Sequence, residues 1–237
     1  MTSRAITGTA GKSLTVQFSP YNITTAKGGP PVPLILCDTM GLEEGTDAGL
    51  HSNDVANICR GHVEDHHLFS PSAPLQEGAP GYRKDATLKD KIHCVVYVVD
   101  ASRVSLMSQK ILDKLRTIRR KVNHMGVPQI LLMTKIDEAC PLVEKDLKNV
   151  YHSDYIQKKA REVSEALGIP LSCVVPVKNY CTETQLNLEV DVLLLSAVEL
   201  MMNYAESFFE NQTPENLDEP LSLRTDQEAG RSLVHPD

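Results

Sequence analysis

The sequence predicts an α/β fold with a doubly wound, mainly parallel sheet. The first observation is that short apolar runs rich in Val, Ile and Leu end at polar residues, as buried strands do. The second is that amphipathic patterns with capping residues lie between these runs, and alternating strands and helices form a parallel sheet with helices on both faces. Four runs are predicted strands: Val32–Cys37, Cys94–Val99, Gln129–Met133 and Ser172–Val177.

A further strand is predicted ahead of these four. Leu14–Phe18 alternates apolar and polar residues, a pattern typical of a strand with one buried face. Lys27, followed by two glycines and two prolines, is a strong turn signal. We therefore expect residues 14–18 to form an antiparallel edge strand in a hairpin with Val32–Cys37.

Three helices are predicted from a capping side chain at the start of an apolar stripe with helical spacing. Glycine and proline mark the ends of the first two, because glycine adopts the left-handed conformation and proline cannot continue a helix. The predicted helices are Ser105–Asn123, ended by Gly126 and Pro128, Ser153–Leu167, ended by Gly168, and Leu188–Phe209, capped by Asn187.

Residues 43–86 differ in composition from the rest of the chain. They are rich in Gly, Pro, His and Asp, with one short helical pattern at Asn53–Cys59. A mostly irregular segment of this length inside a domain is usually functional or disordered. We therefore expect one domain over residues 1–210 that contains a long irregular insertion at residues 43–86, followed by a flexible polar tail over residues 211–237.

Composition narrows the function classes. The 237 residues carry a net charge of −7, which argues against a nucleic-acid partner because nucleic-acid-binding proteins are usually basic. The six cysteines are scattered and several lie in apolar runs, as expected of reduced thiols in a cytosolic core. There is no secretory signal, and charged residues interrupt the longest apolar candidate, Val190–Met202, so we expect no membrane span and a cytoplasmic location.

The end of the first buried strand carries the first candidate site. Asp38 follows directly after Val32–Cys37, and Gly41 comes three residues later. In an open parallel sheet, ligands bind at the carboxyl ends of the strands. There an aspartate can hold Mg²⁺ through water, and a glycine can bring its backbone N–H to a γ-phosphate because it has no Cβ. The alternative is an aspartate that only starts a turn.

The ends of the two later strands carry the candidates for base recognition. Thr134, Lys135 and Asp137 follow the third buried strand. The Asp137 carboxylate can accept hydrogen bonds from guanine N1 and N2, the Lys135 stem can lie along the base, and Thr134 can brace the loop. Lys178 and Asn179 follow the last buried strand, where a loop can meet the base with backbone N–H groups and a polar side chain. The alternative is a charged turn that enters a loop.

With these residues the chain resembles the interferon-induced protein 44 and 44-like family of GTPase-like proteins. The resemblance covers Arg4–Phe209. It implies a P-loop GTPase-like domain that binds GTP or GDP with Mg²⁺, a cytoplasmic location and a link to interferon-driven antiviral immunity. The matching segments are Leu36–Leu42, Leu88–Val95, Asp100–Ser102, Ile118–Arg120, Thr134–Asp137 and Asn179–Tyr180.

The chain departs from this family at the phosphate loop, G-x-x-x-x-G-K-[ST]. The segment Gly8–Ser13 has the wrong spacing, because Ile6 stands where the first glycine is needed, and no strand or helix pattern flanks it. Compared with the family, it corresponds to the stretch that enters the second strand, so we expect the first strand, the phosphate loop and the first helix to be missing. That first strand would lie between Val32–Cys37 and Cys94–Val99, so these two strands should not pair with each other.

Without this loop, nucleotide binding is expected to be impaired. The loop supplies most backbone N–H groups around the phosphates, a lysine and a hydroxyl that ligates Mg²⁺. Thr15, with Ser13 as the weaker choice, is the remaining candidate for a hydroxyl that binds the metal together with Asp38. Leu42 follows Gly41 and cannot orient an attacking water as a glutamine can, so we expect no catalytic residue.

The sequence therefore predicts a guanine-nucleotide-binding, GTPase-like protein of the interferon-induced antiviral response. Guanine nucleotide is its expected small-molecule partner, and protein partners are expected in addition. The alternative is a non-enzymatic protein-interaction scaffold that keeps the fold and has lost the ligand.

Overall fold

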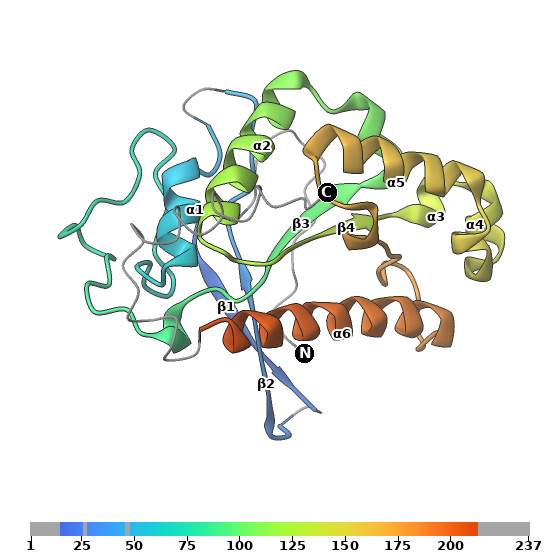
Figure 1. The fold of residues 1–237 in the computed structure, drawn as a ribbon. Helices are drawn as coiled ribbons and strands as arrows, with labels where there is room; N and C mark the ends of the chain where they lie inside the picture. Colours follow the sequence, from blue (N-terminus) through green and yellow to red (C-terminus); the bar gives the residue numbers. More distant parts are fainter. Residues whose placement is uncertain (1–14, 26–27, 46–47, 213–237) are drawn as a thin grey trace, which may run out of the picture.

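The computed structural model describes residues 15–25, 28–45 and 48–212. At its centre lies a parallel sheet of three strands, which confirms the expectation of an α/β fold with a parallel sheet (Figure 1). The strands lie in the order β3 (Val95–Asp100), β4 (Gln129–Thr134) and β5 (Val174–Pro176).

Helices cover both faces of this sheet (Figure 1). Two of them lie on one face and the longest helix lies on the other, as expected for alternating strands and helices. These helices are α2 (Gln109–His124) and α5 (Asp154–Leu167) on the first face and α6 (Leu188–Glu210) on the second.

The middle strand, β4, sends its side chains alternately into the two helical layers. Ile130 packs with Ala197 and Met201 of α6, whereas Leu131 and Met133 belong to the larger core on the other face. All three β4 side chains are completely buried. An apolar run buried on both faces is what a central parallel strand requires, and it explains why the sequence of β4 shows no polar alternation.

Two of the predicted helices are confirmed and the third begins later than expected. Ser153 caps α5, Gly168 ends it in the left-handed conformation, and Asn187 caps α6. The prediction that Ser105 starts the helix before Asn123 is wrong, because α2 is capped by Ser108. The chain from Ala101 to Leu106 forms a 3-10 helix instead.

The hairpin is present, but its first strand lies later than residues 14–18. β1 (Ser19–Thr24) pairs antiparallel with β2 (Pro31–Asp38). The prediction of an edge strand at Leu14–Phe18 is wrong for residues 15–18, and Leu14 lies outside the described residues. Residues 16–18 take part in backbone hydrogen bonds with the insertion instead: Phe18 N–H to His67 O, His66 N–H to Phe18 O and Phe69 N–H to Val16 O.

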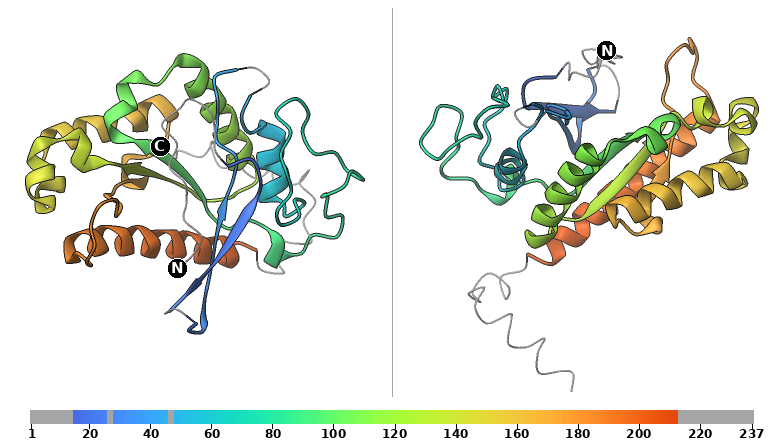
Figure 2. Two further views of the ribbon diagram at one scale, coloured as in Figure 1. Left: turned by 180° about the vertical axis from the view of Figure 1, so that it is seen from behind. Right: turned by 90° about the horizontal axis from the view of Figure 1, so that it is seen from above.

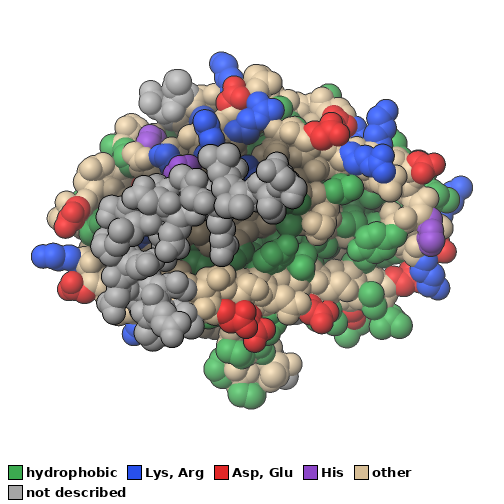
Figure 3. All heavy atoms as spheres, in the orientation of Figure 1, with side chains coloured by type: hydrophobic (Ala, Val, Ile, Leu, Met, Phe, Trp, Pro, Cys, Tyr) green, Lys and Arg blue, Asp and Glu red, His purple; other side chains and the backbone are tan. Residues whose placement is uncertain are grey.

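The hairpin is set apart from the three-stranded sheet (Figure 2). Within the described ranges β2 pairs only with β1, and β3 pairs only with β4, so the two strands are not paired with each other, as expected. The prediction that Val32–Cys37 is a buried strand of the parallel sheet is wrong, because β2 pairs antiparallel with β1 alone and none of its residues is buried. Ile35 of β2 is 55% exposed and Val98 of β3 is 65% exposed. Figure 3 shows hydrophobic side chains at the surface of the protruding hairpin and elsewhere on this side of the molecule.

The described part of residues 43–86 contains one helix of eight residues, α1 (Ser52–Cys59), and otherwise irregular chain with turns, bends and isolated bridges. Cations of α2 hold this segment in place. Lys114 Nζ donates to the carbonyl oxygens of Glu43, Gly45 and Ala48 at 2.6–2.9 Å. Lys121 Nζ donates to Ser52 Oγ at 2.9 Å. Two of the basic residues of α2 thus have a structural role, because Lys114 satisfies carbonyl oxygens of the irregular backbone and Lys121 binds a side chain at the start of α1.

The chain between β4 and α5 forms short helical turns at the carboxyl edge of the sheet. These elements are α3 (Ile136–Ala139), α4 (Pro141–Lys145) and a 3-10 helix at Leu147–Tyr151.

β5 is shorter than the predicted strand Ser172–Val177. Leu171–Cys173 forms a 3-10 helix instead, in which the Cys173 N–H donates to Pro170 O at 2.8 Å.

Two further features concern predictions from composition. All six cysteines are free thiols. Among the described residues, α6 is the one helix that is long and apolar enough to cross a membrane by length and composition alone. Val190, Ala197 and Met201 on its inner side are buried in the protein. The predicted tail falls outside the described residues from position 213 on.

Candidate functional site

The carboxyl ends of β3, β4 and β5 form one edge of the parallel sheet, and charged side chains gather there. Asp100 ends β3 directly opposite Thr134, which ends β4. The Thr134 hydroxyl donates to the Val99 carbonyl oxygen at 3.3 Å. Thr134 therefore ties the end of β4 to the end of β3, and its role in bracing a base-binding loop stays a prediction.

Lys135 turns the chain away from the sheet in a left-handed conformation, with φ 57° and ψ 39°. Among the described residues only His66 is also a non-glycine residue with positive φ. A side chain with a Cβ in this conformation costs about 1–2 kcal/mol. Strain of this kind persists only where the surroundings impose it, and it is often found at functional sites.

The ammonium group of Lys135 lies against Asp100. Its Nζ is 3.3 Å from Asp100 Oδ2 and 3.6 Å from Glu138 Oε2. The hydrogen bond and charge of Asp100 raise the pKa of Lys135. Burial tends to raise the pKa of Asp100, but hydrogen bonds from Ser102 and Lys135 outweigh it and the pKa is lowered. Both groups are thus kept charged, and the Lys135 stem runs along this edge of the sheet.

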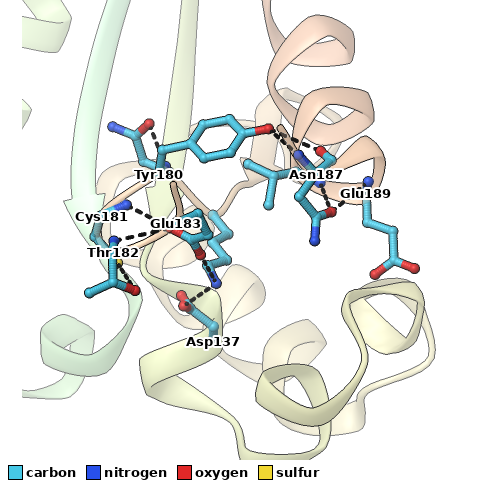
Figure 4. Close-up of polar contacts among 10 residues, drawn as sticks. Asp137, Tyr180, Cys181, Thr182, Glu183, Asn187 and Glu189 are labelled. Atoms are coloured by element: carbon cyan, nitrogen blue, oxygen red, sulfur yellow. Dashed lines mark hydrogen bonds and ion pairs between the residues drawn. The ribbon is translucent and has the colours of Figure 1, made fainter. Parts of the chain in front are cut away.

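Asp137 and Lys178 meet across the ends of β4 and β5. Asp137 lies in α3, and its Oδ2 is 3.3 Å from Lys178 Nζ. The same ammonium is 2.7 Å from Glu183 Oε1. The side chains of Asp137, Lys178 and Glu183 are 17%, 19% and 22% exposed, so they form a partly buried ion cluster (Figure 4).

Hydrogen bonding favours the charged forms of Glu183 and Lys178. The hydrogen bond from Lys178, followed by that from the Cys181 N–H, lowers the pKa of Glu183 to about 2. The hydrogen bond with Glu183 in turn raises the pKa of Lys178. A carboxylate that remains ionised is an acceptor only, which is what recognition of two neighbouring N–H groups needs.

The loop after β5 is fastened to the start of α6. Asn179 Oδ1 accepts the Tyr180 N–H at 2.9 Å, so this side chain stabilises its own loop. The Tyr180 hydroxyl donates to Asp191 Oδ1 at 2.7 Å and accepts the Asn187 N–H at 2.8 Å. Asn187 in turn caps α6 with its side chain. Figure 4 shows Tyr180 reaching across to Asn187 while Glu183 lies toward Asp137.

The candidates for metal and phosphate form a second group at the end of β2. The Thr15 hydroxyl donates to Asp38 Oδ2 at 3.1 Å, and the Thr39 N–H donates to Asp38 Oδ1 at 3.0 Å. The structure therefore brings together the two residues predicted to hold Mg²⁺. A carboxylate and a hydroxyl are oxygen ligands of the kind that Mg²⁺ prefers.

The chain after Gly41 makes a defined turn. The Gly41 carbonyl oxygen accepts the Leu50 N–H at 3.0 Å, and Leu42 bridges to Gly49. Gly49 has φ +73°, and a Cβ there would lie 2.7 Å from the Gly41 oxygen, so only glycine fits. The metal and phosphate candidates and the base-recognition candidates belong to different sheets. Asp38 ends a strand of the β1–β2 hairpin, whereas Asp137 follows β4 of the parallel sheet.

Two residues of the site were not singled out as site residues from the sequence. Asp100 carried a usable signal, because it directly follows the apolar run of β3. Glu183 carried none, since it lies in a loop without periodicity, and only the folded loop brings it to Lys178. The histidine-rich stretch after α1 forms no metal site in the described ranges, which contain no group of three or more potential metal-ligating side chains. Its first histidine, His62, instead stacks on Tyr82.

The described residues thus form an α/β protein with a charged cluster at the carboxyl edge of a parallel sheet. Comparison with curated proteins shows similarity over 211 residues, 89% of this chain. Interferon-induced protein 44-like from Homo sapiens is 31% identical, and the match covers 47% of that protein. Interferon-induced protein 44 is 32% identical in Mus musculus and 33% in Homo sapiens, with 50% and 47% of those proteins covered.

The chain belongs to the interferon-induced protein 44 and 44-like family, which confirms the resemblance drawn from its motifs. It spans about half the length of the curated relatives it matches. No family model matches the chain. No solved structure matches it either.

Proposed function

We propose that this chain is a guanine-nucleotide-binding, GTPase-like protein of the interferon-induced antiviral response, and that it acts in the cytoplasm. The observation that carries the nucleotide part is the position of the Asp137 carboxylate, 3.3 Å from Lys178 at the carboxyl edge of a parallel sheet. This edge is where open α/β sheets bind their ligands. The names of the relatives, all interferon-induced proteins, support the induction by interferon.

In this proposal Asp137 accepts hydrogen bonds from guanine N1 and N2. Lys135 lies along one side of the base, and its strained backbone sets the direction of its stem. Lys178 and Asn179 form the loop on the other side. The charges fit the ligand, because an ionised carboxylate matches the two donors of the guanine edge and finds no such pair on adenine.

The proposed phosphate and metal site lies at the end of β2. Asp38 and Thr15 supply oxygen atoms for Mg²⁺, and Gly41 offers its backbone to a phosphate. Binding is expected to be weak, because backbone donors and a lysine of a phosphate loop normally supply much of the affinity. Leu42 follows Gly41 where a polar side chain would have to orient water, so no hydrolysis is expected.

A test of affinity and turnover uses a fluorescent GTP analogue together with a phosphate-release assay. We expect binding weaker than micromolar and no phosphate release above the rate of a buffer blank. The Lys12→Ala variant is the control for the alternative use of residues 8–13. Sub-micromolar binding that is lost in Lys12→Ala would contradict the proposal, because residues 8–13 would then act as a phosphate loop.

The second candidate is a protein-interaction scaffold without a ligand. It is favoured by the apolar side chains left exposed on β2 and β3, among them Ile35 and Val98. Large exposed apolar patches mark interaction sites in soluble proteins. Selective binding of a guanine nucleotide at Asp137 separates the two candidates, because a scaffold that has lost its ligand would show no base preference.

A further inference from the structure

The carboxylate of Glu183 accepts hydrogen bonds from the loop that follows β5. Its Oε2 accepts the N–H groups of Cys181 at 2.9 Å and Thr182 at 3.1 Å. Its Oε1 lies 2.7 Å from Lys178 Nζ, the same ammonium that is 3.3 Å from Asp137 Oδ2. Glu183 and the base-recognition candidate Asp137 therefore share one cation, and Figure 4 shows both carboxylates linked to the same nitrogen.

A guanine base on Asp137 would need the donors that Glu183 uses. When guanine donates N1–H and N2–H to a carboxylate, its O6 carbonyl lies on the adjoining edge and requires a donor of its own. The donor that the structure places beside Asp137 is the Lys178 ammonium, which Glu183 shares through Oε1. The loop N–H groups of Cys181 and Thr182 meet on Oε2 of the same Glu183 carboxylate. A backbone N–H has a single proton to donate, so the base and Glu183 exclude each other there.

We propose that Glu183 is an internal competitor for guanine: its carboxylate occupies the donors that guanine O6 requires, and the base binds only when this side chain has moved away. This inference rests on the proposed guanine site. The Glu183 side chain is 22% exposed and the residues that follow it, 184–186, are exposed, so its carboxylate lies at the border with solvent. Tyr180 and Asn187 hold the loop to α6, so the side chain can move without the loop.

Glu183 competes with the binding of guanine but not with the binding of adenine. Adenine carries an amino group in place of O6, so it gains nothing from the donors that Glu183 releases. Glu183 therefore lowers the affinity for guanine nucleotides and reduces the difference in affinity between guanine and adenine nucleotides. Removing the charge of Glu183 should increase this difference in affinity.

The first test compares GDP and ADP binding by the unaltered chain, by Glu183→Gln and by Glu189→Gln, using amide chemical shifts at increasing nucleotide concentration. Glu189→Gln is the matched control, because it removes the same charge nearby from a side chain that pairs with Lys148 at 3.4 Å. We expect Glu183→Gln to bind GDP about tenfold more tightly, the value of one charge-assisted hydrogen bond. ADP binding and the Glu189→Gln variant should differ less than about twofold from the unaltered chain.

The second test needs no variant and detects the movement itself. The pKa of Glu183, about 2 in the free protein, is followed by NMR of its side-chain carboxyl carbon with and without saturating GDP. When GDP displaces the carboxylate into water, its pKa should rise toward the usual value for glutamate, about 4.3. With ADP it should stay low.

The outcomes separate this inference from the proposed function. Selective tightening of GDP binding in Glu183→Gln and a rise in the Glu183 pKa support it. Unchanged or weaker GDP binding in Glu183→Gln, with guanine still preferred over adenine, overturns the competitor and leaves the guanine site standing. No preference for GDP over ADP in either protein overturns both.

Discussion

Changing Asp137 to Asn is expected to exchange guanine for xanthine as the preferred base. The amide that replaces the carboxylate would offer an N–H₂ group, which faces the amino group of guanine unfavourably but suits the 2-oxo group of xanthine. Two charge-assisted acceptor contacts to guanine are lost, so GDP binding should weaken by about 2 kcal/mol, roughly thirtyfold. Titration of both proteins with GDP and xanthosine diphosphate measures the exchange.

The matched control for this substitution is Asp154→Asn, which removes the same charge from an exposed position at the start of α5. It should leave both titrations unchanged. If Asp137→Asn binds GDP as well as the unaltered chain does, the carboxylate does not read the base, and Asp137 serves only as the partner of Lys178.

Truncation of Leu131 to Ala is expected to cost more stability than the same change at the surface. Leu131 is completely buried in the middle of β4, opposite Tyr97 of β3 and Val174 of β5. A Leu-to-Ala change at such a position lowers the free energy of unfolding by about 2–5 kcal/mol, because apolar contact is lost and a cavity remains. Urea unfolding followed by far-ultraviolet circular dichroism measures the difference.

Leu106→Ala is the control for the core, because this side chain is 80% exposed at the end of a 3-10 helix. It should change the free energy of unfolding by no more than about 0.5 kcal/mol. Equal losses from the two substitutions would mean that β4 is not the central strand of the sheet.

The parallel sheet was predictable because its strands are apolar on both faces. Ile130, Leu131 and Met133 form a run that only a buried strand can accommodate. The helix ends at Ser153, Gly168 and Asn187 were also predictable, because a helix start favours a capping side chain and a helix end favours a residue in the left-handed conformation. These local preferences are kept in the folded protein because no tertiary contact competes with them.

The sequence predictions failed where contacts that the local pattern does not show decide the structure. Residues 15–18 alternate as a strand does, but residues 66–69 supply their partner, and the sequence carries no signal for that pairing. Ser105 has the chemistry of a helix cap, yet the Asp100 side chain accepts the N–H and hydroxyl of Ser102 and caps a 3-10 helix that runs through Ser105 to Leu106, so the α-helix starts only after Ser108. Such competition between caps is decided by geometry.

Some residues of the candidate site were likewise predictable from local sequence, and others were not. Thr134, Lys135 and Asp137 could be named from the sequence because they follow the buried strand β4, at the edge where the fold class places ligands. Asp38 was named on the same reasoning, but the strand that it ends has no buried residue and lies outside the parallel sheet. Glu183 could not be named from the sequence, because a long-range ion pair with Lys178 alone brings it to the site.

Selective recognition of guanine is tested most directly by calorimetric titration of the unaltered chain with GTP and, separately, with ATP in the presence of Mg²⁺. Asp137 accepts two hydrogen bonds from guanine that adenine cannot donate in that arrangement. We expect GTP to bind at least about tenfold more tightly than ATP, which corresponds to about 1.4 kcal/mol. Equal binding of the two nucleotides, or heat from neither, would contradict a guanine site at Asp137.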